Sequence, residues 1–136
     1  MEETYVRIML AGEADALDRC GVKALSEHLG DRPAEVTVVA VAKRGGVITS
    51  WAALSGATTP DRMAEQALTK ADRAARAIVS ALPRDLAIRH LAVRSWTAAM
   101  PLISAHDVIV VVGKLCRRDR RVTRTVPAAV MRWVDG

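Results

Sequence analysis

The chain has 136 residues, of which 51% are hydrophobic, so it holds enough apolar material for one packed domain over residues 1–136, and disorder is excluded. No apolar run reaches the roughly 20 residues of a membrane-spanning helix and no secretory signal is visible, so a cytoplasmic protein with no membrane partner is expected. The two cysteines fit a reducing compartment and are too few for a disulfide framework.

The net charge of +5 is concentrated in one short segment. Residues 114–124 hold six basic side chains and one acid, Asp119, whereas the rest of the chain has 14 residues of each sign. Proteins that bind a nucleic acid duplex usually spread cations over a whole face, so a nucleic acid is a less expected partner than another anionic ligand or a protein. Since aromatic residues make up only 3%, base stacking is not expected either.

The N-terminal third predicts two strands separated by a helix. Residues 4–11 are mainly β-branched and aliphatic and are followed by Gly12, and apolar residues then recur at helical spacing from Leu17 to Leu29. Gly21 inside this helix costs about 1 kcal/mol relative to alanine, which a close approach to a neighbouring strand would offset. The segment Val36–Ala42 is charge-free and β-branched, as is typical of a central parallel strand.

The middle of the chain predicts a loop and a long helix. Lys43–Thr59 has no clear period and is expected to be a long loop, either functional or a simple packing flap. Thr59 is expected to cap a helix with Pro60 in its first turn, and an apolar stripe continues to Leu82, where Pro83 ends it.

Two further elements are predicted before the last strand. Leu86–Val93 is apolar but interrupted by an arginine and a histidine, which favours a strand at the edge of a sheet. Ala98–Ala105 is expected to be a helix capped by Thr97, because Pro101 then lies in the first turn, where its missing N–H is not needed.

The C-terminal part contains the clearest strand, Val108–Val112, which ends at Gly113. The segment Ala128–Val134 is predicted to be a short helix. Left bare, the aliphatic strand would be an aggregation-prone edge, so we expect it to be covered by a homodimer contact or by the folded-back C-terminus, with Val130 and Trp133 in the seam.

The alternation of strands and helices predicts an α/β fold, a single-domain doubly wound parallel sheet of four or five strands. In such sheets ligands bind beyond the carboxyl ends of the strands, where the strand order reverses. The sequence therefore places the candidate site at Gly12, at residues 41–43 and from Gly113 onward.

No catalytic or metal-binding group of residues is found. Cys20 and His28 lie about 12 Å apart along the helix axis, at 1.5 Å per residue, which is too far for one ion. His90 and His106 have no neighbouring ligand in the sequence, so polar contacts are the predicted role of the histidines. Cys116 beside several arginines is either a reactive thiol or an inert one, and no nucleophile motif occurs, so the chain is not expected to be an enzyme.

An anion could bind just after the clearest strand. Lys114 directly follows Gly113, further cations such as Arg117 come next, and Thr125 precedes a segment that begins with a proline. Backbone N–H groups and arginines in this arrangement suit an anion, although a solvated basic loop is the alternative. The Walker and dinucleotide-binding glycine motifs are absent.

The order of the elements and the motif Ala105–Gly113 resemble the universal stress protein family over most of the chain. The resemblance implies an adenine-nucleotide alpha-hydrolase-like fold and a homodimeric stress-response protein. It also implies ATP, AMP or another anionic nucleotide as the ligand, with Gly113 as the first glycine of a phosphate loop and Val41 as a neighbour of the adenine.

The sequence departs from the family pattern where the phosphates would bind. Cys116 stands at the second glycine of the loop, Val126 and Pro127 stand at the final Gly-Ser/Thr, and Ala11 and Gly12 stand where an aspartate is expected. Larger residues would block the close backbone approach to phosphates. The resemblance therefore implies a branch that does not bind ATP or binds a different anion. The alternative is binding of an anionic partner or nucleic acid through residues 114–124.

Overall fold

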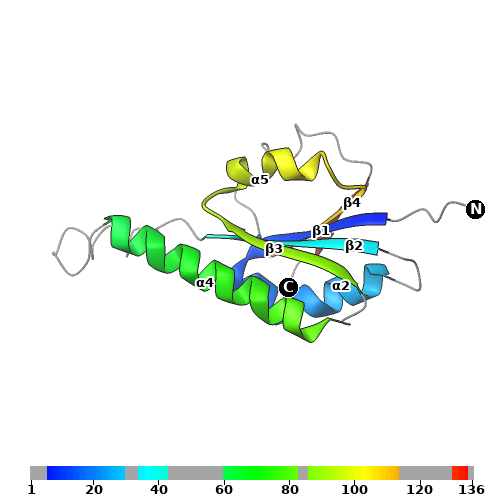
Figure 1. The fold of residues 1–136 in the computed structure, drawn as a ribbon, viewed down its shortest axis with the longest axis horizontal. Coiled ribbons are helices and arrows are strands. Elements are labelled where there is room, and N and C mark those ends of the chain that lie inside the picture. The colour runs from blue at the N-terminus through cyan, green and yellow to red at the C-terminus, as the bar shows by residue number, and fades with distance from the viewer. Residues whose placement is uncertain (1–5, 30–33, 43–59, 83–85, 114–129, 135–136) are drawn as a thin grey trace, which may run out of the picture.

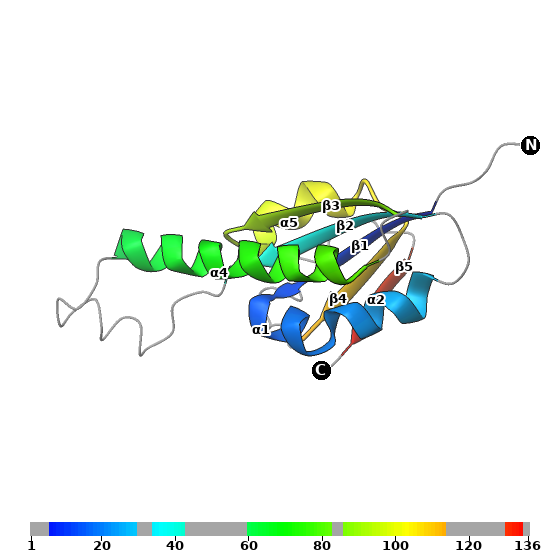
Figure 2. The same ribbon diagram turned by 60° about the horizontal axis from the view of Figure 1, so that its bottom comes forward.

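The computed structural model describes residues 6–29, 34–42, 60–82, 86–113 and 130–134. The strands are β1 (Val6–Glu13), β2 (Ala34–Val41), β3 (Ala87–Val93), β4 (Val108–Val112) and β5 (Val130–Val134). They form one sheet in the order β3-β2-β1-β4-β5, and every neighbouring pair is parallel (Figure 2). The predicted α/β fold with a parallel sheet is confirmed.

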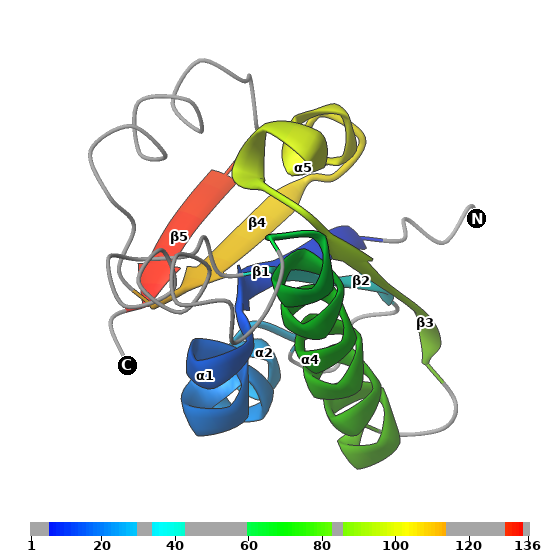
Figure 3. The same ribbon diagram turned by 90° about the vertical axis from the view of Figure 1, so that its left-hand side faces the viewer.

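Helices cover both faces of the sheet. The segments α1 (Ala14–Ala16), η1 (Leu17–Gly21) and α2 (Val22–Leu29) follow one another directly, and together with α4 (Pro60–Ala81) they pack on one face. The short helix α5 (Trp96–Ile103) lies on the other face, as Figures 1 and 3 show. The sheet is therefore doubly wound, as the sequence predicts.

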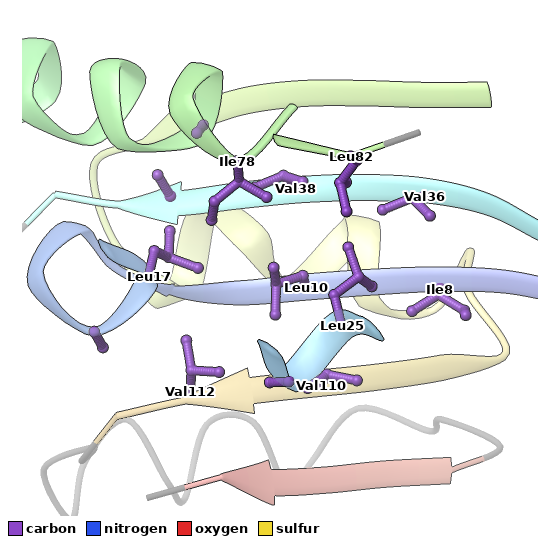
Figure 4. Close-up of a cluster of buried hydrophobic side chains, with 14 of the residues drawn as sticks. Ile8, Leu10, Leu17, Leu25, Val36, Val38, Ile78, Leu82, Val110 and Val112 are labelled. Atoms are coloured by element: carbon purple, nitrogen blue, oxygen red, sulfur yellow. The ribbon is translucent and has the colours of Figure 1, made fainter. Parts of the chain in front are cut away.

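Two apolar cores result from the two-residue period of the strands. The larger core lies between the sheet and the helical segments α1, η1, α2 and α4, and Figure 4 shows its strand residues meeting helix side chains such as Leu17, Leu25 and Ile78. The smaller core lies under α5 and contains Met9, Val39 and Ile109 among others. The strands β1, β2 and β4 are buried on both faces, which explains why their sequences are nearly continuous runs of aliphatic residues.

The first helical segment contains a π-helical turn, η1, that the sequence did not predict. At Gly21 an added Cβ would lie 2.8 Å from Cδ1 of Ile78 on α4 and 3.6 Å from Cδ2 of Leu10 on β1. Gly21 therefore lies against the strand β1, as expected, but its tightest contact is with helix α4, which the sequence did not predict. The thiol of Cys20 donates a hydrogen bond to the carbonyl oxygen of Ala16, at 3.2 Å.

The C-terminal segment is a strand, so the helix expected over Ala128–Val134 is wrong. The strand β5 pairs in parallel with β4, and the register sets Val130 beside Val108 and Trp133 beside Val111. The seven residues 128–134 are apolar except for Arg132, and such a short run fits a helix or a strand, so the open edge of β4 decides between them. The expected covering of β4 by the folded-back C-terminal segment is confirmed.

Helix α5 begins two residues earlier than expected. The hydroxyl of Ser95, not that of Thr97, caps the helix by accepting a hydrogen bond from the N–H of Ala98, at 3.2 Å. Pro101 therefore lies in the second turn rather than the first. Ser95 has an extended backbone, which is the conformation that an N-cap residue adopts.

The histidines differ in their contacts. His106 bridges the end of α5 to the sheet, because its Nδ1 donates to the carbonyl oxygen of Leu102 at 2.6 Å and its Nε2 lies 2.8 Å from the hydroxyl of Thr37, the one buried polar residue within the described ranges. Since a carbonyl oxygen can only accept, Nδ1 carries a proton, whereas the hydroxyl of Thr37 is able either to donate to Nε2 or to accept from it. His28 Nδ1 lies 2.7 Å from the carbonyl oxygen of Ala24. The predicted polar contacts are confirmed for these two histidines.

The remaining boundaries agree with the sequence to within a few residues. The strand predicted over residues 4–11 continues through Gly12 to Glu13, and β3 lies at an edge of the sheet, as predicted. The loop expected over Lys43–Thr59, with the cap Thr59, and Pro83 after α4 lie outside the described residues. In the part of the chain that the structure describes, no helix has the length and apolar character to cross a membrane.

Candidate functional site

The order of the strands reverses between β1 and β4. The chain adds β2 and β3 on one side of β1, and then β4 and β5 on the other side. Gly12 pairs in register with Val112, so Gly12 and Gly113 leave the sheet at neighbouring positions of one edge, as the sequence predicts. We call the ends of β1, β2, β3 and β4, namely Gly12, Glu13, Val41, Val93 and Gly113, the carboxyl rim.

Both glycines of the carboxyl rim are packed against the chain itself. An added Cβ at Gly12 would lie 2.5 Å from Cγ2 and 2.9 Å from the carbonyl oxygen of Val112. Gly113 has a φ of +90°, and a Cβ there would lie 2.7 Å from Cβ of Ala16. These glycines therefore bring β1, β4 and α1 into close contact, and the space beside their Cα atoms is already filled by protein.

Val41 lies at the rim but its side chain faces inward. It is 2% exposed and packs in the smaller core with Ala11 and Trp96. The N–H of Ala42 donates to the carbonyl oxygen of Val93 at 2.8 Å, which carries the pairing of β2 and β3 to the rim. Only the backbone here is placed to meet a ligand at the edge of the sheet.

Carboxylates surround the start of the first helix. Glu13 occupies the N-cap position without a side-chain capping bond, and Asp15 lies in the first turn. Lys70 of α4 contacts Asp15 at 2.9 Å, with both side chains more than half exposed. The hydrogen bond to Asp15, and next the negative charge of Asp15, raise the pKa of Lys70 above the ordinary lysine value of 10.5, so Lys70 is charged at neutral pH.

Trp96 is a residue at this end of the sheet that the sequence reasoning missed. It opens α5 three residues after β3 ends, it is 3% exposed, and its indole N–H is the one buried side-chain polar atom in the described ranges without a hydrogen-bond partner. Such orphaned donors are rare and costly in folded proteins. An aromatic residue three positions after a predicted strand, in a chain with so few aromatics, is the signal that could have identified it.

Three of the six predicted site residues are not placed. Lys114, Arg117 and Thr125 lie outside the described residues, as does the rest of the basic segment 114–124. The structure therefore brings together Gly12 and Gly113, sets Val41 two strands away from Gly113 along the same rim, and does not test the anion-binding arrangement beyond Gly113.

The two glycines of the carboxyl rim serve the packing of the chain itself, because an added Cβ would meet Val112 at Gly12 and Ala16 at Gly113. A phosphate cradle uses open backbone N–H groups, and the segment after Gly113 that was predicted to supply them lies outside the described residues. Glu13 and Asp15 also lie at the helix N-terminus, where a phosphate would otherwise be favoured, and Lys70 balances the charge of Asp15. Within the ranges that are described, no three histidine, cysteine or acidic residues lie close enough to hold a metal ion.

No family model matches this sequence, and no curated protein matches it. Among solved structures, the chain is similar to a universal stress protein whose crystal structure was determined in complex with cAMP. The two chains are 17% identical, the match covers 97% of this chain and 98% of that chain, and the TM-score is 0.44. Because this similarity is low, the α/β fold is assigned from the order and pairing of the strands in this chain itself.

Proposed function

We propose that this chain is a regulatory protein of the universal stress type. In this proposal it acts in a stress response in the cytoplasm, as a homodimer and without catalytic chemistry of its own. Its nucleotide site is degenerate, so the carboxyl rim does not hold ATP and takes an adenine nucleoside, a nucleotide with few phosphates or another anion instead.

The observation that carries the proposal is the meeting of Gly12 and Gly113 where the strand order reverses. Open parallel sheets bind ligands at this point. The motif Ala105–Gly113 adds the resemblance to the family, and the carboxylates of Glu13 and Asp15 argue against a polyphosphate.

The homodimer part of the proposal concerns β5. This strand ends the sheet on the side opposite to β3, and the family resemblance implies that a fifth strand beside the fourth serves in dimerisation. A strand at an edge that pairs with a second copy no longer offers its backbone groups to other chains. The outer edge of β5 is therefore the contact that we propose.

A second candidate function is binding of an anionic partner or a nucleic acid through residues 114–124. The observation in its favour is that this segment carries the whole net charge of the chain and directly follows Gly113. Such binding would depend steeply on salt. Retention on immobilised DNA duplex that disappears as the salt concentration rises would support it.

A thermal-shift series tests the proposed site. Adenosine, AMP, cAMP and ATP are compared at equal concentration with the full-length protein, since a ligand that binds the folded state raises the Tm. We expect a rise with adenosine or the monophosphates and no larger rise with ATP, because added phosphates approach Glu13 and Asp15.

A pair of variants makes this test specific. Asp15→Asn removes one carboxylate at the rim and should increase the response to ATP relative to adenosine. Asp72→Asn is the matched control, because Asp72 also forms an ion pair, with Arg76 at 3.0 Å, but along the exposed face of α4. A Tm that rises steadily with the number of phosphates in the unaltered protein would contradict the degenerate site, and silence throughout would favour the second candidate function.

A further inference from the structure

One long edge of the sheet is formed by β3. The carbonyl oxygen of Val93 accepts a hydrogen bond from Ala42, the residue directly after β2, so the backbone groups of Val93 point toward the sheet. Because backbone groups alternate in direction along a strand, those of Ala87, Arg89 and Leu91 do the same, while the N–H and C=O groups of Ile88, His90 and Ala92 point away from it.

No described segment covers these outward-pointing backbone groups. In Figure 1 β3 faces the viewer in front of β2, with α4 on one side and α5 on the other, and neither helix crosses it. No described segment pairs with the outer side of β3. The seven-residue strand is therefore a template onto which another extended segment could add, as in known cases of strand addition.

The side chains along this edge include two arginines and a histidine. Arg89, His90 and Arg94 are exposed, and none of them has an ion-pair partner in the part of the chain that the structure describes. The register places Arg89 on the face that carries α5 and His90 on the face that carries α4, so a guanidinium borders the edge on one face and an imidazole on the other. The sequence has no acidic residue from position 86 to position 106.

We propose that the outer edge of β3 is a docking strand for an extended acidic segment of a partner protein. Backbone hydrogen bonds to Ile88, His90 and Ala92 would provide the pairing, and acidic side chains alternating along the segment would meet Arg89 on one face and His90 on the other. The proposal is independent of the nucleotide site and of the dimer contact at β5, because β3 is the opposite edge of the sheet.

A second copy of this chain fits the edge less well. Pairing of two β3 strands would bring the cations of both copies to one seam, where like charges oppose each other. Charges on an edge strand also hinder self-association in general. If they served only to prevent self-association, no acidic partner would be required. The chemistry of the edge therefore favours an acidic segment, and a second copy becomes an outcome of the test.

The test uses the full chain, labelled with ¹⁵N, and a blocked seven-residue peptide that alternates glutamate and valine. We expect amide shifts that are concentrated at β3, with the largest at Ile88, His90 and Ala92, and a Kd that rises with salt. The double variant Arg89→Glu and Arg94→Glu should raise the Kd at least about fivefold. The control Lys23→Glu reverses an exposed cation on α2 and should leave the Kd unchanged.

Two altered peptides keep the test decisive even if a variant folds poorly. A lysine–valine peptide should not bind, and neither should the acidic peptide with N-methyl groups at alternate residues, because it cannot form the backbone ladder. Equal binding of either peptide, shifts located away from β3, or no shift with the acidic peptide at millimolar concentration would overturn the proposal. Protection of β3 amides that grows with protein concentration alone would overturn it in favour of a second copy.

Discussion

Gly113 shows how one residue fixes the geometry of the carboxyl rim. Its φ of +90° is a conformation that side chains rarely adopt, and its Cα approaches Ala16 so closely that a Cβ would lie 2.7 Å from that of the alanine. The strand β4 can therefore turn away directly after Val112 and still touch the start of the first helix. The residue serves packing whether or not a ligand binds beside it.

Replacing Gly113 with alanine should lower the free energy of unfolding by about 2 kcal/mol, because the left-handed backbone costs roughly 1–2 kcal/mol and the contact with Ala16 adds to it. Urea unfolding measures the change. The variant Ala16→Gly removes only the steric part, so the double variant should lose less stability than the sum of the two single changes. Strictly additive losses would show that the contact with Ala16 contributes nothing.

The helical segment from α1 to α2 carries the most unusual element, the π-helical turn η1. The turn has an ordinary contact at its start and a tight one at its end. A Cβ added at Gly12 would lie 3.6 Å from Cγ of Leu17, whereas a Cβ added at Gly21 would lie 2.8 Å from Cδ1 of Ile78 on α4. Turns of this kind are rare and are often found near functional sites. Here the turn begins one residue after Ala16 and so borders the rim.

The variant Gly21→Ala tests this packing at the level of the two helices. Alanine favours a helix by about 1 kcal/mol over glycine, but its Cβ would lie 2.8 Å from Cδ1 of the buried Ile78. We expect Gly21→Ala to be less favourable in the unaltered protein than in an Ile78→Val background, where Cδ1 is absent. Equal effects of Gly21→Ala on thermal stability in the two backgrounds would refute the close approach of the helices.

The prediction of secondary structure succeeded where one sequence signal dominates and failed where two signals compete. Val108–Val112 is a run of five β-branched residues and could be identified as a strand from the sequence. Val130–Val134 fits a helix as well as a strand, and its pairing partner is far away in the sequence. At the site, the meeting of Gly12 and Gly113 followed from the parallel topology, whereas the orphaned N–H of Trp96 depends on three-dimensional packing that no local pattern encodes.

At the scale of the whole molecule, β5 protects the apolar strand β4. Deleting residues 130–136 should expose the edge of Val108–Val112 and cause aggregation, because an uncharged aliphatic edge pairs readily with other chains. Size-exclusion chromatography with light scattering measures this, and deletion of residues 135–136 alone is the control. If the longer deletion stayed monodisperse with an unchanged Tm, β5 would not have this protective role.

The central position of β1 has a consequence for how the chain folds as it is synthesised. The backbone of Arg7 is hydrogen-bonded to the side chain of Asp107, one hundred positions later, and the neighbouring strand β4 follows directly. Until that region leaves the ribosome, one side of the innermost strand has no native partner. Contacts between such distant parts of a chain form slowly, so the nascent protein is most exposed to wrong pairing just before its last quarter emerges.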